Sequence, residues 1–276
     1  KSEVLFRSFG RFVQGLGGRY ITAEDVGTTV HDMEWVRMET QYVTGISRAL
    51  GGSGDPSPVT AFGTYIGMLA TVKKQMGKDS LQGLKVSVQG VGHVGYHLCK
   101  YLADAGAEIY ATDIDQQSLK KIADKYNSTI VDLDKIYDLD VDIYAPCALG
   151  ATINDETIPR IKASIIAGAA NNQLAEEAKH GQMLKDKGIL YAPDYAINAG
   201  GLINVANEID GYNRERAFNQ AEGIYETLMT IYETSDAENI PTNHAAEKVA
   251  IQRMEEISKL RNVFLPKQNP MSKRDN

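Results

Sequence analysis

The sequence has few cysteines, no long apolar run and no export signal at its start. Its two cysteines, Cys99 and Cys147, fall within an expected helix and beside an expected strand, which argues against a disulfide framework and favours a reducing compartment. No apolar stretch approaches the roughly 20 residues that span a bilayer. The first residues lack the charged and then apolar order of a signal peptide. We therefore expect a cytoplasmic protein without a membrane partner.

Positive charge is also sparse. The 276 residues contain 29 Lys and Arg against 36 Asp and Glu, which gives a formal net charge of −7. No basic run exceeds pairs such as Lys73-Lys74 and Lys120-Lys121. Because binding to nucleic acid requires phosphates to be neutralised, this pattern argues against a nucleic acid partner. Hydrophobic residues make up 43% of the chain, which suits a globular core, and the expected ligands are small molecules.

Metal-ligand patterns are lacking as well. The five histidines are scattered along the chain, at His31, His93, His97, His180 and His244. His93 and His97 share a helix face at i, i+4, but no third ligand is identifiable, so packing or solvent exposure explains them better than a metal does. We predict no metal site.

What the sequence does contain, between residues 85 and 194, is an alternation of short β-like runs with helical patterns. The β-like runs are KVSVQ (85–89), EIYATD (108–113), DIYAPC (142–147), SIIAGA (164–169) and ILYAPD (189–194). Helical patterns begin near residue 93 and cover 116–126 and 175–188. The runs are rich in Val, Ile, Tyr and Ala without strict polar alternation, as in strands buried on both faces. This order predicts a parallel sheet covered by helices on both sides.

Three glycines in G-x-G-x-x-G spacing, Gly90, Gly92 and Gly95, follow the first of these strands and open a helix. In a dinucleotide site the first makes the tight turn, the second admits the pyrophosphate and the third allows close helix packing, with the phosphates at the positive end of the helix dipole. Asp113, about 20 residues further on, is placed to bind the adenine-ribose hydroxyls and to repel a 2′-phosphate, which favours NAD over NADP. Asp115 is the rival acid but also suits the N-cap of the next helix. The alternative is an ordinary glycine-rich turn.

The remaining segments divide the chain. Residues 1–18 read as a helix with an apolar stripe of Leu5, Phe6, Phe9, Phe12, Val13 and Leu16. A Gly/Pro/Ser cluster at 51–63 opens another helix, and the long helical stretches 199–238 and 242–265 are broken by Pro241. We predict an α/β protein with a Rossmann-type, doubly wound NAD domain at 46–240. Residues 1–45 and 241–276 are expected to form the remainder of a second, α/β catalytic domain built from both chain ends.

Several longer motifs, in order, carry a family resemblance through essentially the whole chain. They are GGRYITAEDVGTTVHDM (17–33), GSGDPSPVTAFG (52–63), CALGATIN (147–154), AGAANNQL (167–174), YAPDYAINAGGLINVANE (191–208) and GYNRERA (211–217). Together they resemble the glutamate/leucine/phenylalanine/valine dehydrogenases, and within that family the leucine-specific members most closely. The resemblance implies oxidation of an amino acid at Cα by NAD, followed by hydrolysis of the imine to a 2-oxo acid and ammonium. It also implies a homo-oligomer, an octamer.

The resemblance assigns roles to individual residues. Asp25 matches the family's acid-base carboxylate; read without the family, it is a loop or helix-start Asp near Thr28 and Thr29. Asn198 matches the asparagine that contacts substrate and nicotinamide, or else is a turn residue. The full set expected to contact NAD is Gly90, Val91, Gly92, His93, Val94, Gly95, Tyr96, Asp113, Thr60, Cys147, Ala148, Asn171 and Asn198.

The resemblance also identifies the substrate pocket, in which Ala23, Leu202 and Val205 join Asn198. Ala23, Leu202 and Val205 are apolar. Burying a side-chain carboxylate, such as that of glutamate, against them without partners would cost several kcal/mol, so we expect an aliphatic substrate side chain. Leucine, isoleucine and valine differ by about one methylene, worth roughly 1–3 kcal/mol, and all three are expected substrates. Taken alone, Leu202 and Val205, which are three residues apart on a helix, are more typical of ordinary core packing.

One departure from the family concerns two lysines, one that binds the substrate carboxylate and one that acts as general base in a Gly-Gly-Gly-Lys motif. Neither motif occurs in this sequence. We expect this sequence to be a fragment that lacks roughly ninety N-terminal residues of the family pattern. The competing interpretations are a phenylalanine or valine dehydrogenase and a catalytically silent NAD-binding fragment. Ala23 argues against the phenylalanine enzyme, because phenylalanine enzymes tend to have glycine at this position.

Overall fold

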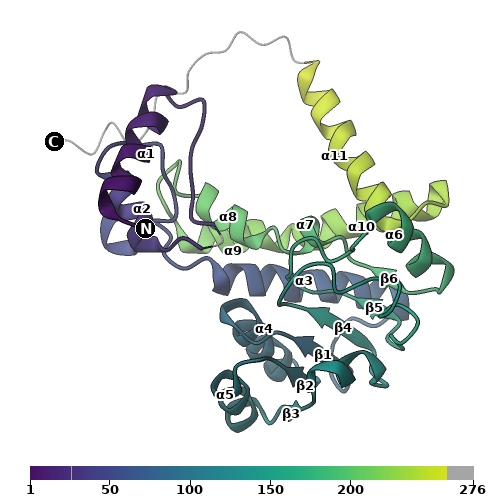
Figure 1. The fold of residues 1–276 in the computed structure, drawn as a ribbon. Helices are drawn as coiled ribbons and strands as arrows, with labels where there is room; N and C mark the ends of the chain where they lie inside the picture. The colour runs from purple at the N-terminus through teal and green to yellow at the C-terminus, as the bar shows by residue number, and fades with distance from the viewer. Residues whose placement is uncertain (26, 260–276) are drawn as a thin grey trace. The chain divides into compact units, whose positions relative to one another are not determined.

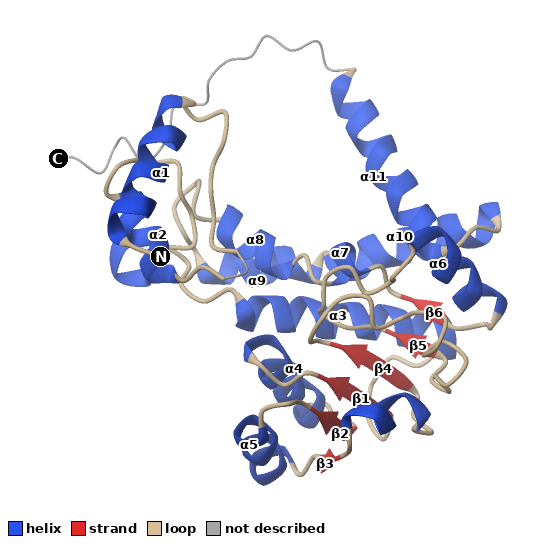
Figure 2. Ribbon diagram, viewed as in Figure 1, coloured by secondary structure: helices blue, strands red, loops and turns tan. Residues whose placement is uncertain are grey.

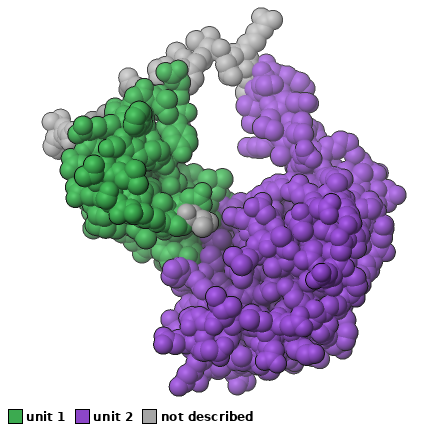
Figure 3. Space-filling view, viewed as in Figure 1, with its two compact units in different colours: residues 1–59, 201–220, 264–276 green, residues 60–200, 221–263 purple. Residues whose placement is uncertain are grey.

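The computed structural model describes residues 1–25 and 27–259 (Figure 1). These residues form two compact units, coloured separately in Figure 3. Unit 1 comprises residues 1–59 and 201–220, and unit 2 comprises 60–200 and 221–259. Within this described part of the chain, no helix has both the length and the apolar character needed to cross a membrane.

Unit 2 is built around six parallel strands in the order β3-β2-β1-β4-β5-β6, which Figure 2 shows side by side in one sheet. Their bounds are β1 Lys85–Gln89, β2 Glu108–Thr112, β3 Thr129–Ile130, β4 Ile143–Pro146, β5 Ile165–Ile166 and β6 Leu190–Tyr191. The strand order reverses between β1 and β4, the point at which a doubly wound sheet binds its ligand. The predicted α/β, Rossmann-type fold is confirmed.

The strand sequences explain the sheet. Val86 of β1 pairs with Ile109 of β2 on one side and with Ile143 of β4 on the other, so its side chain is fully buried. All five predicted strands form, although β5 and β6 are only two residues long. The sequence did not predict β3, because this two-residue edge strand has exposed side chains and therefore no buried apolar run.

Helices surround the sheet. The helices of unit 2 are α3 Ser57–Met76, α4 His93–Asp104, α5 Gln116–Tyr126, α6 Glu177–Asp186, α7 Asp194–Ile197, α10 Ile224–Glu238 and α11 Thr242–Ser258. Residues 57–59 of α3 belong to unit 1. Helices α4 and α5 lie against β1, β2 and β3, whereas α6 and α11 contact β6. A 3-10 helix, Leu133–Asp138, contributes Ile136 to a core that includes Tyr144 and Tyr191.

The helical stretch predicted at 199–238 is interrupted in two places. It forms α8 Gly200–Ala206, α9 Arg214–Glu222 and α10, with a break at residues 207–213 and another at Gly223. In the first break Gly211 has a φ of +82°, which only glycine adopts easily. The guanidinium of Arg216 holds this turn by donating to the carbonyl oxygens of Asn207 and Gly211. The second predicted stretch is α11, and residues 260–265 lie outside the described residues.

Unit 1 contains α1 Glu3–Gly15, α2 Val30–Arg37 and most of α8 and α9, with the 3-10 helix Arg48–Leu50. The apolar stripe expected on α1 is only partly buried: Phe6 and Val13 pack inward, while Leu5, Phe9, Phe12 and Leu16 are exposed. Gly10 allows the close packing of α1 on α2, because a Cβ there would lie 2.8 Å from the carbonyl oxygen of Val36. A core of Phe6, Met33, Val36, Val43 and Ile46 fills the unit.

The units differ from the predicted domain limits in three segments. Residues 46–59 and 201–220 belong to unit 1 rather than to the sheet-containing unit, and 241–259 belong to unit 2. Contacts between distant residues account for the difference. The Glu208 carboxylate accepts hydrogen bonds from the backbone N–H groups of Gly45 and Ser53, which joins the first two segments within unit 1. Helix α11 contacts α10, α6 and β6, all in unit 2.

Candidate functional site

The glycine turn between β1 and α4 leaves space on one side only. Gly90 has a φ of +97°, and a Cβ there would lie 2.6 Å from the Cβ of Ala148. A Cβ on Gly95 would lie 2.1 Å from the carbonyl oxygen of Gly90, so the helix and the turn are in direct contact. A Cβ on Gly92, by contrast, would have no neighbour within 4 Å. The turn is therefore closed where the chain must pack and open where a ligand could approach the backbone.

The first turn of α4 faces this open side. Gly92 is the N-cap of α4, and no side chain caps the helix there. The backbone N–H groups at a helix start, together with the helix dipole, attract anions, so this turn fits the pyrophosphate of a dinucleotide. Val91 is buried, whereas His93 is exposed and Val94 is half-buried. The Tyr96 hydroxyl accepts a hydrogen bond from Nζ of Lys125, and this contact lowers the tyrosine pKa.

Asp113, at the end of β2, binds the glycine turn directly. Its Oδ2 accepts a hydrogen bond from the backbone N–H of Val91 at 2.6 Å, and its Oδ1 accepts one from the N–H of Asp115 at 2.9 Å. The rival acid, Asp115, is the N-cap of α5, and its carboxylate accepts from the N–H groups of Gln117 and Ser118. Hydrogen bonding by Ser118 lowers the pKa of Asp115. Asp113 is thus the acid beside the glycine turn.

A cavity of about 400 Å³ adjoins Asp113. It is lined by residues of β2, β3 and the start of α5, including Asp113, Ile114, Ile130 and Leu133. Ile114 is 84% exposed and Leu133 is 48% exposed, so apolar surface lies open beside the carboxylate. The cavity fits a nucleoside, that is, a flat nucleobase ring attached to a ribose. The Asp113 carboxylate can accept hydrogen bonds from the ribose hydroxyls, while the ring covers the apolar side chains.

The segment that follows β4 borders the glycine turn, and the segment that follows β5 lies against the end of β4. The backbone N–H of Cys147 donates to the carbonyl oxygen of Gln89 at 2.7 Å, which places Cys147 and Ala148 next to the turn. Gly168 allows the next loop to approach, because a Cβ there would lie 2.2 Å from the carbonyl oxygen of Pro146. Burial raises the pKa of the Cys147 thiol to about 11, so it stays protonated at neutral pH and is a packing group rather than a nucleophile.

Asn198 and Asn171 are brought together at the same edge of the sheet. The Asn198 side-chain amide donates to the carbonyl oxygen of Ala169 at 3.2 Å and to Oδ1 of Asn171 at 2.5 Å. Thr60 lies in the first turn of α3. This helix packs closely on the chain around Asn198, because a Cβ on Gly63 would lie 3.4 Å from Cα of Gly200.

Two buried residues that the sequence did not identify, Asp194 and Gln173, hold the loop that carries Asn171. The Asp194 carboxylate accepts hydrogen bonds from the N–H groups of Gln173 and Tyr195 at 3.0 and 2.7 Å. The Gln173 amide donates to the carbonyl oxygens of Gly168 and Ala170 at 2.8 and 2.9 Å. The signal that could have found Asp194 is its place after Pro193, where a carboxylate at a helix start often binds backbone N–H groups.

Asp25 lies in unit 1, on an exposed turn. Its backbone N–H donates to Oγ1 of Thr28 at 2.8 Å, and the Thr28 N–H donates back to its carbonyl oxygen at 2.8 Å. The cap of α2 is Thr29, which forms a reciprocal capping box with Asp32. The interpretation of Asp25 as a helix cap is therefore wrong, whereas its place in a loop beside Thr28 is confirmed.

The other predicted substrate residues are also in unit 1. Ala23 follows Thr22, which forms an isolated parallel bridge with Val43, and its side chain is half-buried. On α8, Val205 is 9% exposed but Leu202 is 72% exposed. The exposure of Leu202 rules out ordinary core packing for this residue within the described chain and leaves it available to a ligand, while Val205 has little exposed surface.

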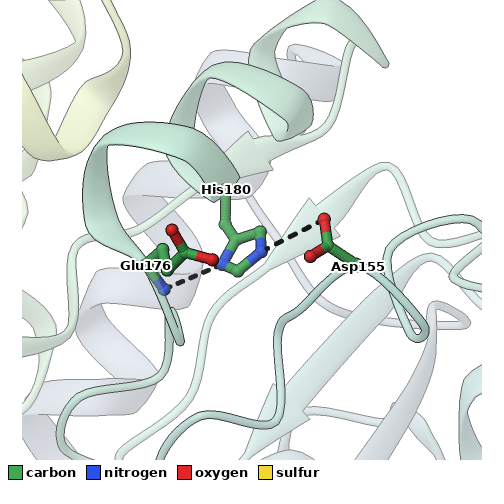
Figure 4. A group of neighbouring side chains, drawn as sticks. All are labelled: Asp155, Glu176 and His180. Carbon is green, nitrogen blue, oxygen red and sulfur yellow. Dashed lines mark hydrogen bonds and ion pairs between the residues drawn. The ribbon is translucent and has the colours of Figure 1, made fainter.

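A separate group, Asp155, Glu176 and His180, has the composition of a metal site (Figure 4). His180 is buried, and its Nδ1 accepts a hydrogen bond from the backbone N–H of Glu176 at 2.9 Å. In the neutral ring the proton is therefore on Nε2, which faces Asp155 Oδ1 at 3.6 Å and cannot also offer a lone pair to a metal. Lys179 supplies positive charge at 2.5 Å from Asp155. The group accordingly links α6 to the chain at 155.

Comparisons with known proteins agree with this geometry. The Glutamate/Leucine/Phenylalanine/Valine dehydrogenase family pattern matches residues 51–116 and 108–262. The chain is 56% identical over 268 residues to leucine dehydrogenase of Thermoactinomyces intermedius, which covers 97% of this chain and 73% of that protein. It is 46% identical over 259 residues to phenylalanine dehydrogenase of Bacillus thermotolerans, which covers 92% of this chain and 68% of that protein.

A solved structure agrees as well. The chain is similar to L-tryptophan dehydrogenase from Nostoc punctiforme, with a TM-score of 0.84 and 44% identity over 94% of this chain and 74% of that one. Sequence and fold thus point to the same group of enzymes, whose members act on amino acids with different side chains. The chain belongs to the Glutamate/Leucine/Phenylalanine/Valine dehydrogenase family and is an amino-acid dehydrogenase.

Proposed function

We propose that the protein catalyses the reversible, NAD-dependent oxidative deamination of L-leucine and other branched-chain amino acids to 2-oxo acids and ammonium. The observation that carries the proposal is the 56% identity to a leucine dehydrogenase over 97% of the chain. The exposed Leu202 and the half-buried Ala23 support it, since both offer apolar surface to an aliphatic side chain. NAD is the cofactor, and it fits the open side of Gly92 and the carboxylate of Asp113.

The predicted site residues have separate roles in this reaction. NAD, when bound, accepts the hydride from the substrate Cα. Asp25 exchanges a proton with the amino nitrogen as that nitrogen changes from ammonium to imine, and Asn198 orients the substrate beside the nicotinamide. Ala23, Leu202 and Val205 receive the side chain and exclude water from it. No lysine of this chain is assigned to the substrate carboxylate or to activation of water.

The first test compares substrates. With NAD and each amino acid in turn, we expect absorbance of reduced nicotinamide to rise fastest with leucine, isoleucine and valine and much more slowly with phenylalanine. Ala23→Gly removes one methyl group from the pocket and should raise kcat/KM for phenylalanine by about tenfold, the value of roughly one or two methylenes of pocket space. Ala206→Gly, at an exposed position on the same helix as Leu202, is the control.

The outcomes separate the alternatives. Turnover that is fastest with phenylalanine in the unaltered protein would replace the leucine assignment with a phenylalanine dehydrogenase, for which the 46% identical relative provides a precedent. Binding of NAD without turnover of any amino acid would support the silent NAD-binding fragment.

The second test concerns the choice of cofactor. Asp113→Asn removes the negative charge and replaces one carboxylate oxygen with an NH2 group, which cannot accept a hydrogen bond. We expect NAD affinity to fall by about 10- to 100-fold, the value of one hydrogen bond to a charged group, and the preference over NADP to shrink. Asp115→Asn is the matched control, because Asn caps a helix as well as Asp does and its side chain is turned to α5. An unchanged NAD to NADP ratio in Asp113→Asn would refute the role of Asp113.

The proposal extends to assembly and location. We propose that unit 2 is the NAD-binding domain, that unit 1 belongs to the catalytic domain, and that the protein works in the cytoplasm as a homo-oligomer, an octamer. The exposed apolar residues of α1, Val4, Leu5, Phe9 and Phe12, support an interface between subunits. Sedimentation analysis tests the assembly, and a single species at 30.2 kDa would contradict it.

A further inference from the structure

Unit 1 contains a buried carboxylate that is not among the residues discussed as catalytic. Glu208 is 2% exposed, and its Oε1 accepts hydrogen bonds from the backbone N–H groups of Gly45 at 2.9 Å and Ser53 at 2.7 Å. Burying a charged group is costly unless hydrogen bonds compensate, and bonds to a charged acceptor are about twice as strong as neutral ones. One carboxylate oxygen therefore fixes two points of the segment that precedes α3.

Gly45 transmits this contact to the segment that carries Asp25. Residues 22–24 run parallel to 42–45: the Thr22 N–H donates to the Tyr42 carbonyl oxygen at 3.0 Å, and the Thr44 N–H donates to the Thr22 carbonyl oxygen at 2.8 Å. Gly45 has a φ of +78°, and a Cβ there would lie only 3.1 Å from the backbone nitrogen of Glu24. The residue bound by Glu208 is thus packed against the chain immediately before Asp25.

Glu208 also lies close to the end of α8, the helix that carries Leu202 and Val205. Its backbone N–H donates to the carbonyl oxygen of Val205 at 3.0 Å, so it follows α8 directly, one turn after Val205 and two turns after Leu202. A negative charge near the C-terminal end of a helix is unfavourable because the helix dipole is negative there. Stability of α8 therefore does not explain an acid at this position, whereas the two N–H groups that it binds do.

We propose that Glu208 is a positioning residue, which holds the segment with Ala23 and Asp25 in register with the helix that carries Leu202 and Val205. The inference rests on the proposed function, because it assumes that these residues face the same amino acid. All of these residues lie in unit 1, and the glycine turn lies in unit 2. Loss of Glu208 should consequently affect the amino acid and not NAD.

The experiment compares Glu208→Ala, Glu208→Gln and the exposed control Glu215→Ala on α9. Hydrogen exchange, measured by mass spectrometry, reports on residues 20–25 and 43–53, steady-state kinetics gives kcat/KM for leucine, and calorimetric titration gives the Kd for NAD. In Glu208→Ala we expect faster exchange in both segments, with kcat/KM for leucine lower by about tenfold to a hundredfold, the effect of displacing reacting groups by about 1 Å. The Kd for NAD should not change.

Glu208→Gln keeps an oxygen that can accept both N–H groups, and it should restore most of the exchange protection and of kcat/KM. Should Glu208→Ala fail to fold, Glu208→Asp, whose shorter side chain cannot reach both N–H groups, replaces it with the same expectation. The inference is overturned if exchange and kcat/KM for leucine match the unaltered protein, if NAD affinity falls in parallel with kcat/KM for leucine, or if Glu208→Gln behaves like Glu208→Ala. If the unaltered protein does not oxidise leucine, the proposed function fails, while the exchange data still decide whether Glu208 holds the two segments.

Discussion

Asp25→Asn is expected to lower kcat for leucine oxidation by about 10²- to 10⁴-fold, the usual contribution of a positioned acid-base group, and to leave the Kd for NAD unchanged. The amide has nearly the shape of the carboxylate but cannot exchange a proton with the substrate nitrogen. The backbone of Asp25 is held by Thr28 in both directions, so the turn itself should persist in the variant. Single-turnover absorbance of reduced nicotinamide measures the chemical step directly.

The neighbouring acid provides the control for this result. Glu24→Gln changes a carboxylate one residue away in the same segment and should keep most of the activity. The two variants together separate a specific proton carrier from a general need for negative charge in this segment. Loss of activity in Glu24→Gln with retention in Asp25→Asn would move the catalytic role to Glu24 and refute the assignment.

The second large effect concerns the glycine turn, where alanine substitutions at Gly95 and Gly92 should differ in their effects on stability and on NAD affinity. Gly95→Ala places a methyl group 2.1 Å from the carbonyl oxygen of Gly90, and the backbone cannot yield without separating α4 from β1. We expect the free energy of unfolding to fall by about 1–3 kcal/mol, as for other overpacked sites, with NAD affinity falling too. Denaturant titration and calorimetric binding measure the two quantities.

Gly92→Ala should lower NAD affinity without a comparable loss of stability. Its Cβ would have no neighbour within 4 Å and its φ is −64°, so stability should change by less than about 0.5 kcal/mol. The methyl group would nevertheless occupy the open side where the pyrophosphate must approach the backbone, and NAD affinity should fall by about tenfold or more, roughly 1.4 kcal/mol. Full NAD affinity in Gly92→Ala would show that the cofactor does not use this side of the turn.

A strand or helix could be predicted where its own residues contain the burial pattern and, for a helix, the capping residue that define it. The runs 85–89 and 116–126 match β1 and α5 to the residue, because one is buried on both faces and the other has a capping acid and a clear apolar stripe. Helix α2 was not predicted, because it has only eight residues, and its start signal, Thr29 with Asp32, lacks the more usual Glu or Gln. The break at 207–213 was not predicted, although Gly211, which has a φ of +82°, and Arg216, which donates to the carbonyl oxygens of Asn207 and Gly211, are both local in the sequence.

The same distinction applies to the candidate site. Gly90, Gly92 and Gly95 could be assigned distinct structural roles from spacing alone, because the strand, turn and helix that need them are consecutive in the sequence. Glu208 could not be recognised in this way, since its partner Gly45 is 163 positions away along the chain. Asp25 and Leu202 depended on the family resemblance, because an exposed carboxylate and an exposed leucine have no local pattern that marks a site.

The bond between Asp113 and Val91 has a consequence for the order of binding. The backbone N–H of Val91 in the glycine turn donates to Asp113 Oδ2 at the end of β2, at 2.6 Å. This bond holds the turn in shape without a contact from NAD. A dinucleotide that docks on a rigid cradle loses less affinity to chain ordering than one that must freeze a mobile loop. We therefore expect NAD to bind to the protein in the absence of an amino acid.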